Sequence, residues 1–149
     1  MQRDAKISNV ELAKRVDLTP TPCFDRVRRL EEAGYIEGYV AQLNPQKLGM
    51  GLLAFIEINL DRTNPTAFDE LRRQMEHLPF VLECHMIAGG FDYLLKVRVA
   101  DMAAFRKLLG EQISTLPGVS RTHTYFVMEE VKRTQELPIP GMKIKHART

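Results

Sequence analysis

The hydrophobic pattern of this chain changes its period at one cluster of helix-breaking residues, and this change limits the folds open to it. The cluster runs from Asn44-Pro45 to Gly49-Met50-Gly51. Before it, apolar residues recur at the spacing of helices. After it, helical stretches alternate with stretches in which every second residue is apolar. We therefore expect two small domains, residues 1–44 and residues 45–133, followed by a loose tail, residues 134–149.

The first segment is predicted to form two short helices joined by a tight turn. Ser8 is a suitable N-cap for a helix over residues 9–16, and Thr19, with prolines after it, suits the start of the second helix. Gly34 supplies a stop for the second helix, and residues 35–43 are predicted to form a strand leading out. This pattern is typical of a helix-turn-helix unit, whose second helix enters the major groove of DNA.

The second segment predicts the element order β-α-β-β-α-β. Strands are expected over residues 53–60, 81–87, 91–99 and 119–128, and helices are expected to begin after the caps Asn64 and Asp101. This order is the ferredoxin-like α+β arrangement, in which both helices cover one face of an antiparallel sheet. The fold class is therefore an α+β chain with a helix-turn-helix head.

Bulk charge says little about function. The chain has a formal net charge of +2, but residues 1–44 hold seven basic and seven acidic side chains, and residues 45–133 hold eleven of each. The basic surplus lies entirely in the tail. Any case for a nucleic-acid partner must therefore rest on local arrangement.

We expect a cytoplasmic protein without a membrane partner. The chain has no apolar run of about 18 residues, and its first residues are polar, without the apolar core of a secretory signal. Cys23 and Cys84 are expected to be free thiols that serve as buried apolar fillers in a reducing compartment.

The sequence carries no recognisable catalytic or metal-binding pattern. Residues 49–54 fit the glycine pattern of dinucleotide sites, but they precede a strand instead of joining a strand to a helix. Cys84 and His85 are adjacent on a strand, so their side chains point to opposite faces and do not share a metal. We expect no catalytic residue and no metal. A small enzyme on a dimeric ferredoxin-like barrel stays open as an alternative, because that fold hosts many activities.

The outward face of the second helix suits DNA. With Val27 facing inward, Arg28 and Arg29 point outward and Arg26 lies at the edge, a grouping that suits phosphate anchoring and guanine readout. The alternative is a solvated helix whose acidic residues pair with these arginines. The candidate DNA-binding residues are Thr19, Thr21, Pro22, Asp25, Arg26, Arg28 and Arg29.

Several segments of the chain resemble the Lrp/AsnC family of transcription regulators. They are residues 7–13, 19–23, 26–30 and 34–36 in the first half, and residues 90–96, 116–119 and 125–132 in the second. The resemblance extends over residues 2–133. It implies a regulator that binds double-stranded DNA and responds to an amino acid, leucine or another apolar one such as methionine. It also implies a homodimer that assembles into larger rings, often octamers.

The resemblance further implies an amino-acid site between dimers, at the turn joining the second and third strands. Here that turn is Ala88-Gly89-Gly90-Phe91-Asp92. The glycines let backbone N–H groups approach a carboxylate, and Asp92 can accept from an ammonium group. The alternative is an ordinary hairpin turn. The candidate effector-binding residues are Met86, Ala88, Gly89, Gly90, Phe91, Asp92, Met102 and Tyr125, of which the two methionines and Tyr125 are expected to form a nearby wall. No cofactor is expected besides this effector.

One part of the family pattern is incomplete in this sequence. The family has a further helix before Ile7, and residues 1–6 match only its end. Without it, four apolar residues lack burial worth about 1.5–3 kcal/mol each: Val10, Leu12, Val27 and Leu30. We expect either a start site further upstream, a trimmed chain, or impaired DNA binding. In the last case the chain would be an amino-acid-binding oligomeric sensor that no longer reads DNA.

Overall fold

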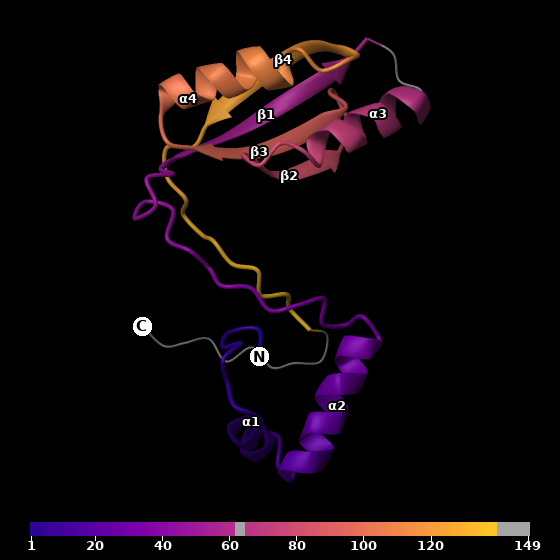
Figure 1. Cartoon of the computed structure of the whole chain (residues 1–149), viewed down its shortest axis with the longest axis vertical. Coiled ribbons are helices and arrows are strands. Elements are labelled where there is room, and N and C mark those ends of the chain that lie inside the picture. The colour runs from indigo at the N-terminus through magenta and orange to yellow at the C-terminus, as the bar shows by residue number, and fades with distance from the viewer. Residues whose placement is uncertain (62–64, 140–149) are drawn as a thin grey trace. The chain divides into compact units, whose positions relative to one another are not determined.

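The computed structural model describes residues 1–61 and 65–139, which belong to two compact units (Figure 1). The first unit comprises Met1–Gln42 and the chain from Lys132, and the second comprises Leu43–Val131.

The first unit contains the two predicted helices, α1 (Asn9–Arg15) and α2 (Pro20–Glu32). The Ser8 hydroxyl accepts a hydrogen bond from the backbone N–H of Glu11 at 3.2 Å, so the predicted cap is confirmed. Thr19 occupies the N-cap position of α2, but its side chain makes no capping hydrogen bond. Gly34 has a φ of +74°, which favours glycine, and it ends α2 as predicted.

The prediction of a strand over residues 35–43 is wrong. The segment is irregular, with Tyr35 81% and Val40 73% exposed. A strand needs a hydrogen-bonded neighbour, and no strand of the described chain pairs with this one. Tyr39 instead donates its hydroxyl hydrogen bond to the Glu31 carboxylate at 2.8 Å, which ties the segment back to α2.

The start of the chain holds the described part of the tail. The side-chain amide of Gln2 donates to the carbonyl of Leu137 at 3.0 Å and accepts from its N–H at 2.7 Å, while Arg3 pairs with Glu136 at 2.8 Å. The expectation of a loose extension is therefore wrong for Glu136 and Leu137. Residues 140–149 lie outside the described residues.

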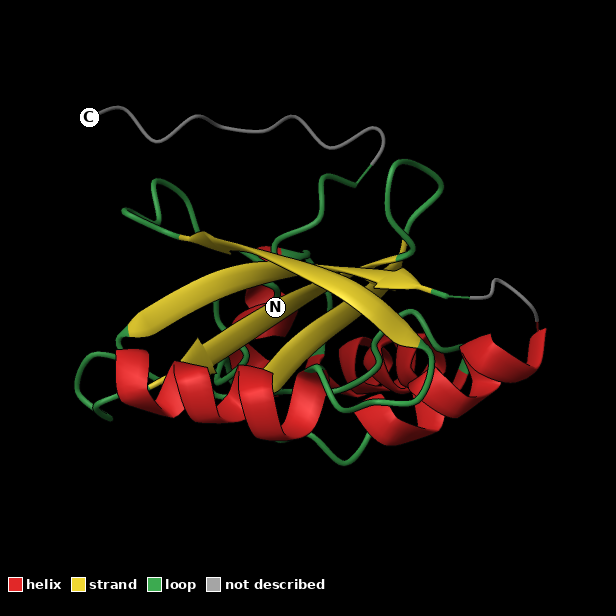
Figure 2. Ribbon diagram, turned by 90° about the horizontal axis from the view of Figure 1, so that it is seen from above, coloured by secondary structure: helices red, strands yellow, loops and turns green. Residues whose placement is uncertain are grey.

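The second unit has the predicted β-α-β-β-α-β order. Its elements are β1 (Leu52–Leu60), α3 (Pro65–Met75), β2 (Val81–Met86), β3 (Tyr93–Val99), α4 (Met102–Lys107) with its π-helical continuation η1 (Leu108–Ile113), and β4 (Val119–Phe126). The strands form one antiparallel sheet in the order β2-β3-β1-β4. The helices of this unit lie along one face of the sheet (Figure 2). Asn64, the cap predicted for α3, lies outside the described residues.

The core lies between the sheet and these helices. Ala54, Ile56 and Ile58 alternate along β1 and are fully buried, as their two-residue period predicts. Leu71 of α3 and Ile113 of η1 are likewise buried against the sheet. The opposite face of the sheet carries side chains such as Phe55, which are only half-buried.

Asp101 caps α4 as predicted, because its carboxylate accepts from the backbone N–H of Ala104 at 2.8 Å. We expect Asp101→Ala to lower the free energy of unfolding by about 1 kcal/mol, measured by urea denaturation. Asp101→Asn keeps an acceptor at the same place and serves as the control. An unchanged urea midpoint for Asp101→Ala would show that the cap contributes nothing.

Candidate nucleic-acid interface and effector site

Buried contacts between α1 and α2 hold the second helix in place. Ala13 of α1 and Cys23 of α2 are 1% and 2% exposed, and they are the buried side chains of this helix pair. The side-chain amide of Asn9 donates to the carbonyl of Pro20 at 2.7 Å, which fixes the start of α2 against α1. These contacts leave the opposite side of α2 free to meet a partner.

Every residue of the predicted DNA-binding set is exposed: Thr19, Thr21, Pro22, Asp25, Arg26, Arg28 and Arg29. The alternative of arginines neutralised by neighbouring acids is met only in part. Arg28 pairs with Glu32 at 2.9 Å, whereas Arg26 and Arg29 form no ion pair within the described ranges. Glu31 accepts from Tyr39 instead. The arginine face of α2 therefore carries positive charge available to phosphates.

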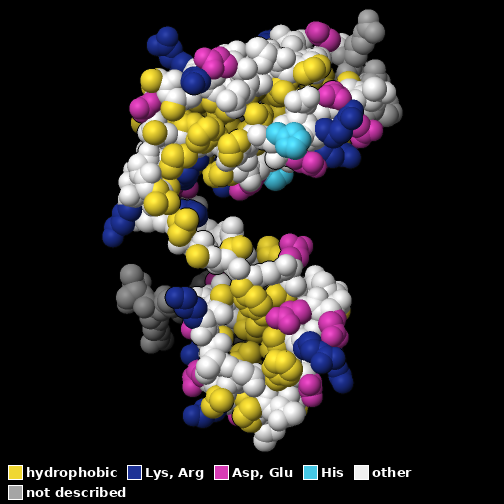
Figure 3. Space-filling view, in the orientation of Figure 1, with side chains coloured by type: hydrophobic (Ala, Val, Ile, Leu, Met, Phe, Trp, Pro, Cys, Tyr) yellow, Lys and Arg dark blue, Asp and Glu magenta, His cyan; other side chains and the backbone are white. Residues whose placement is uncertain are grey.

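The helix pair also exposes apolar side chains, which Figure 3 shows gathered on the visible face of the first unit. Val10 is 53% and Leu30 is 42% exposed, whereas Leu12 and Val27 are half-buried. The structure thus agrees with the expectation that the head buries little of this apolar surface.

Asp92 fastens the predicted effector turn to the end of β1. Its carboxylate oxygen Oδ2 accepts from the backbone N–H of Leu60 at 2.8 Å, and its own N–H donates to the carbonyl of Ile58 at 2.9 Å. Nearby, the amide of Asn59 donates to the carbonyl of Gly90 at 3.3 Å. One oxygen of Asp92 is therefore occupied in positioning the turn, a role that the sequence pattern did not reveal.

The two glycines of the turn are not required by its backbone. Neither Gly89 nor Gly90 has a positive φ, and a Cβ at Gly90 would meet no atom within 4 Å. Both glycines, with Ala88 beside them, are exposed, and Phe91 is half-buried. Ordinary turn chemistry therefore does not explain the glycine pair, whereas the need for open space around the backbone does.

A single chain does not bring all the predicted effector residues together. Met86 pairs with Tyr93 directly beside the turn. Tyr125 lies on the far edge strand, where it pairs with Phe55 and where a hydrogen bond to Glu57 raises the pKa of its hydroxyl. Met102 follows the far end of β3, about 20 Å from the turn at the usual rise of a strand. The expectation of one wall near the turn is therefore wrong within one chain.

The two cysteines differ in their surroundings. Both thiols are free, and Cys23 is buried as predicted. Cys84 is exposed, so that part of the prediction is wrong, because β2 is an edge strand that no further strand covers. The described chain contains no group of three or more residues placed to hold a metal ion. In the same ranges no helix has the length and hydropathy needed to span a membrane.

Comparison with known families agrees with this division of the chain. Residues 53–137 match the Lrp/AsnC ligand binding domain, and residues 1–37 match a winged helix-turn-helix DNA-binding domain. The chain belongs to the Lrp/AsnC family of transcription regulators.

Relatives of known function and structure support the same assignment. The chain is 55% identical to the leucine-responsive regulatory protein of Escherichia coli K12 over 93% of its own length and 85% of that protein. Its fold matches a transcriptional regulator of Neisseria meningitidis in complex with L-methionine, with a TM-score of 0.87, 36% identity, and coverage of 92% of this chain and 88% of that one. It also matches a feast or famine regulatory protein of M. tuberculosis complexed with L-methionine, with a TM-score of 0.80, 33% identity, and coverage of 91% and 90%.

These relatives are regulators rather than enzymes, in agreement with the prediction that this Lrp/AsnC regulator has no catalytic function. The family assignment sets aside the alternative of an enzyme on a ferredoxin-like barrel. The chain is an amino-acid-responsive regulator of transcription.

Proposed function

We propose that the chain binds double-stranded DNA through α2 and that leucine or methionine, bound at residues 88–92, changes this binding. The observation that carries the proposal is the arginine face of α2, where Arg26 and Arg29 are exposed and form no ion pair in the described chain. Such side chains can meet phosphates and base edges without first giving up a partner inside the protein.

The effector part of the proposal rests on the turn. Gly89 and Gly90 leave space around exposed backbone, and Asp92 fixes the turn at the end of β1 while keeping one carboxylate oxygen for an ammonium group. The presence of L-methionine in the two related structures supports an apolar amino acid as the ligand.

We further propose that the active form is a homodimer that assembles into a higher oligomer, an octamer by family resemblance, and that it works in the cytoplasm. The turn offers a ligand only one exposed side, so a second copy of the chain is needed to close the site. The half-buried face of the sheet around Phe55 supplies a surface for the pairing of two copies.

A mobility-shift titration of the full chain against promoter DNA tests the proposal. We expect a complex at low salt, an affinity that falls steeply as salt rises, and a shifted titration when leucine or methionine is added. No complex at low salt would refute DNA binding. If calorimetry then still detected leucine, the alternative of an amino-acid sensor without DNA binding would replace it. A complex that ignores both amino acids would refute the effector assignment.

A further inference from the structure

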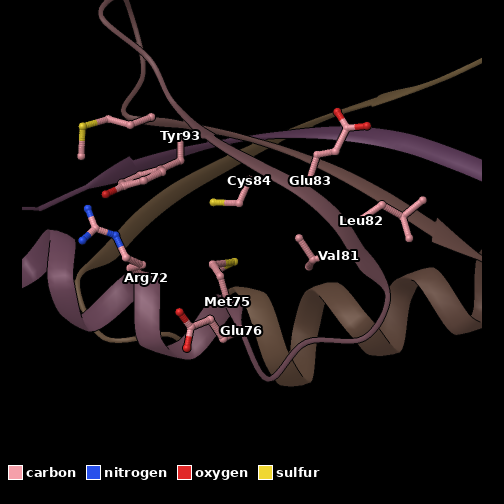
Figure 4. Close-up of a pocket in the computed structure, with 9 residues that line it drawn as sticks. Arg72, Met75, Glu76, Val81, Leu82, Glu83, Cys84 and Tyr93 are labelled. Carbon is pink, nitrogen blue, oxygen red and sulfur yellow. The ribbon is translucent and has the colours of Figure 1, made fainter. Parts of the chain in front are cut away.

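A hollow of about 460 Å³ opens between α3 and the edge strand β2, on the helix side of the sheet (Figure 4). Its volume lies within the range of about 300–1,000 Å³ that is usual for small-molecule sites. It lies beneath the strand, whereas the turn over residues 88–92 is a loop at the strand's end, so the hollow is a separate feature of the unit.

Tyr93 is the first sign that the hollow takes a ligand. The residue is only 5% exposed, with its ring packed edge-on against Phe68 at a centroid distance of 6.1 Å. Its hydroxyl points toward Arg72 in Figure 4 and has no hydrogen-bond partner in the described parts of the chain. Buried polar groups are normally paired, so an unpaired hydroxyl that faces a hollow suggests a missing partner.

The protonation state of Tyr93 suits an acceptor ligand. Burial raises the pKa of the phenol, while the nearby Arg72 guanidinium opposes that shift. The hydroxyl is therefore protonated at neutral pH and can donate a hydrogen bond.

Two opposite charges line the same hollow from one helix. Arg72 and Glu76 are four residues apart on α3 and so lie on the same face. Arg72 makes only a 3.4 Å contact with Asp69, and Glu76 has no side-chain partner within the described ranges. A guanidinium beside a phenol suits a carboxylate, and a free carboxylate beside them suits an ammonium group.

The remaining walls are apolar and adaptable. Met75 is 8% exposed, and the free thiol of Cys84 points into the hollow (Figure 4). Burial raises the pKa of Cys84, so its thiol is neutral near pH 7. Sulfur-containing side chains accommodate apolar groups of varied shape.

We propose that this hollow is a second ligand site, one that binds a free apolar α-amino acid. The ligand's carboxylate meets Arg72 and Tyr93, its ammonium group meets Glu76, and its side chain lies between Met75 and Cys84. The site is independent of the turn and therefore stands or falls separately from the proposed effector site.

Alkylation of Cys84 reports directly on this hollow. Iodoacetamide should label Cys84 in the full chain, whereas Cys23 is 2% exposed and serves as an internal control in peptide mass spectrometry. We expect saturating L-leucine or L-methionine to slow the labelling of Cys84 several-fold. The oxo acid 4-methyl-2-oxopentanoate, which is leucine without its ammonium group, should protect Cys84 much less. Equal protection by the oxo acid, or none by either amino acid, overturns the proposal.

Variants separate this hollow from the turn. Arg72→Met and Glu76→Gln, both at exposed positions, should weaken protection about tenfold in ligand concentration. Asp69→Asn removes the present partner of Arg72 without touching the hollow and should leave protection intact. Asp92→Ala should also leave it intact, even where it abolishes the response of DNA binding to leucine. If Arg72→Met and Glu76→Gln are protected as well as the wild type, the hollow is not the site.

Discussion

The double variant Arg28→Ala, Arg29→Ala is expected to bind DNA about 100-fold more weakly than the wild type, because each arginine contact with a base or phosphate is worth about 1–3 kcal/mol. Both side chains are exposed on α2. The fold should be kept, since the only ion pair that is lost within the described chain is the surface pair of Arg28 with Glu32, and such pairs contribute little. Fluorescence anisotropy at several salt concentrations measures the loss.

A charge-matched control is available in the second unit. Arg73 of α3 is also exposed and also paired along its helix, with Glu70. Arg73→Ala removes the same charge without touching α2, so we expect DNA affinity close to that of the wild type. If the α2 variant also binds like the wild type, another surface contacts DNA. A shallower dependence of log K on log salt in the α2 variant would identify the lost contacts as phosphate contacts.

The elements that depend on local pattern were predictable from the sequence. Ile56 and Ile58 alternate with half-buried residues, and this two-residue period is sufficient to predict β1 and its buried face. The capping residues Ser8 and Asp101 likewise marked the starts of α1 and α4, because a cap hydrogen bond joins residues only three apart.

The features that were mispredicted depend on partners far away in the sequence. Residues 35–43 carry strand-like side chains, but no strand of the described chain pairs with them. Cys84 lies in an apolar stretch, yet its strand is at the edge of the sheet, so the thiol stays exposed. The contact of Gln2 with Leu137 spans nearly the whole chain, and no periodicity reveals such a contact.

The candidate sites were predictable in part. The arginine face of α2 follows from its helical period alone, since all three arginines prove exposed. The turn over residues 88–92 was located by resemblance, but its attachment through Asp92 to Leu60 became visible only in the structure. Met102 and Tyr125 were grouped with the turn, although sheet topology separates them from it within one chain.

Asp92→Ala is expected to destabilise the second unit by about 1–3 kcal/mol, because it leaves the buried backbone N–H of Leu60 without its acceptor. The same change frees the turn from β1 and removes the negative charge proposed to meet the effector's ammonium group. We therefore also expect DNA binding to lose its response to leucine or methionine. Urea denaturation measures the first effect, and mobility-shift titration with and without the amino acid measures the second.

Asp92→Asn separates these two roles. Its amide oxygen can still accept from Leu60, so stability should stay within a few tenths of a kcal/mol of the wild type, whereas the charge is gone. If the response to the amino acid is lost in a stable Asp92→Asn protein, the carboxylate acts on the ligand itself. If the response survives in Asp92→Asn and disappears only in Asp92→Ala, Asp92 acts by holding the turn against β1, and the backbone around Gly89 and Gly90 carries the recognition.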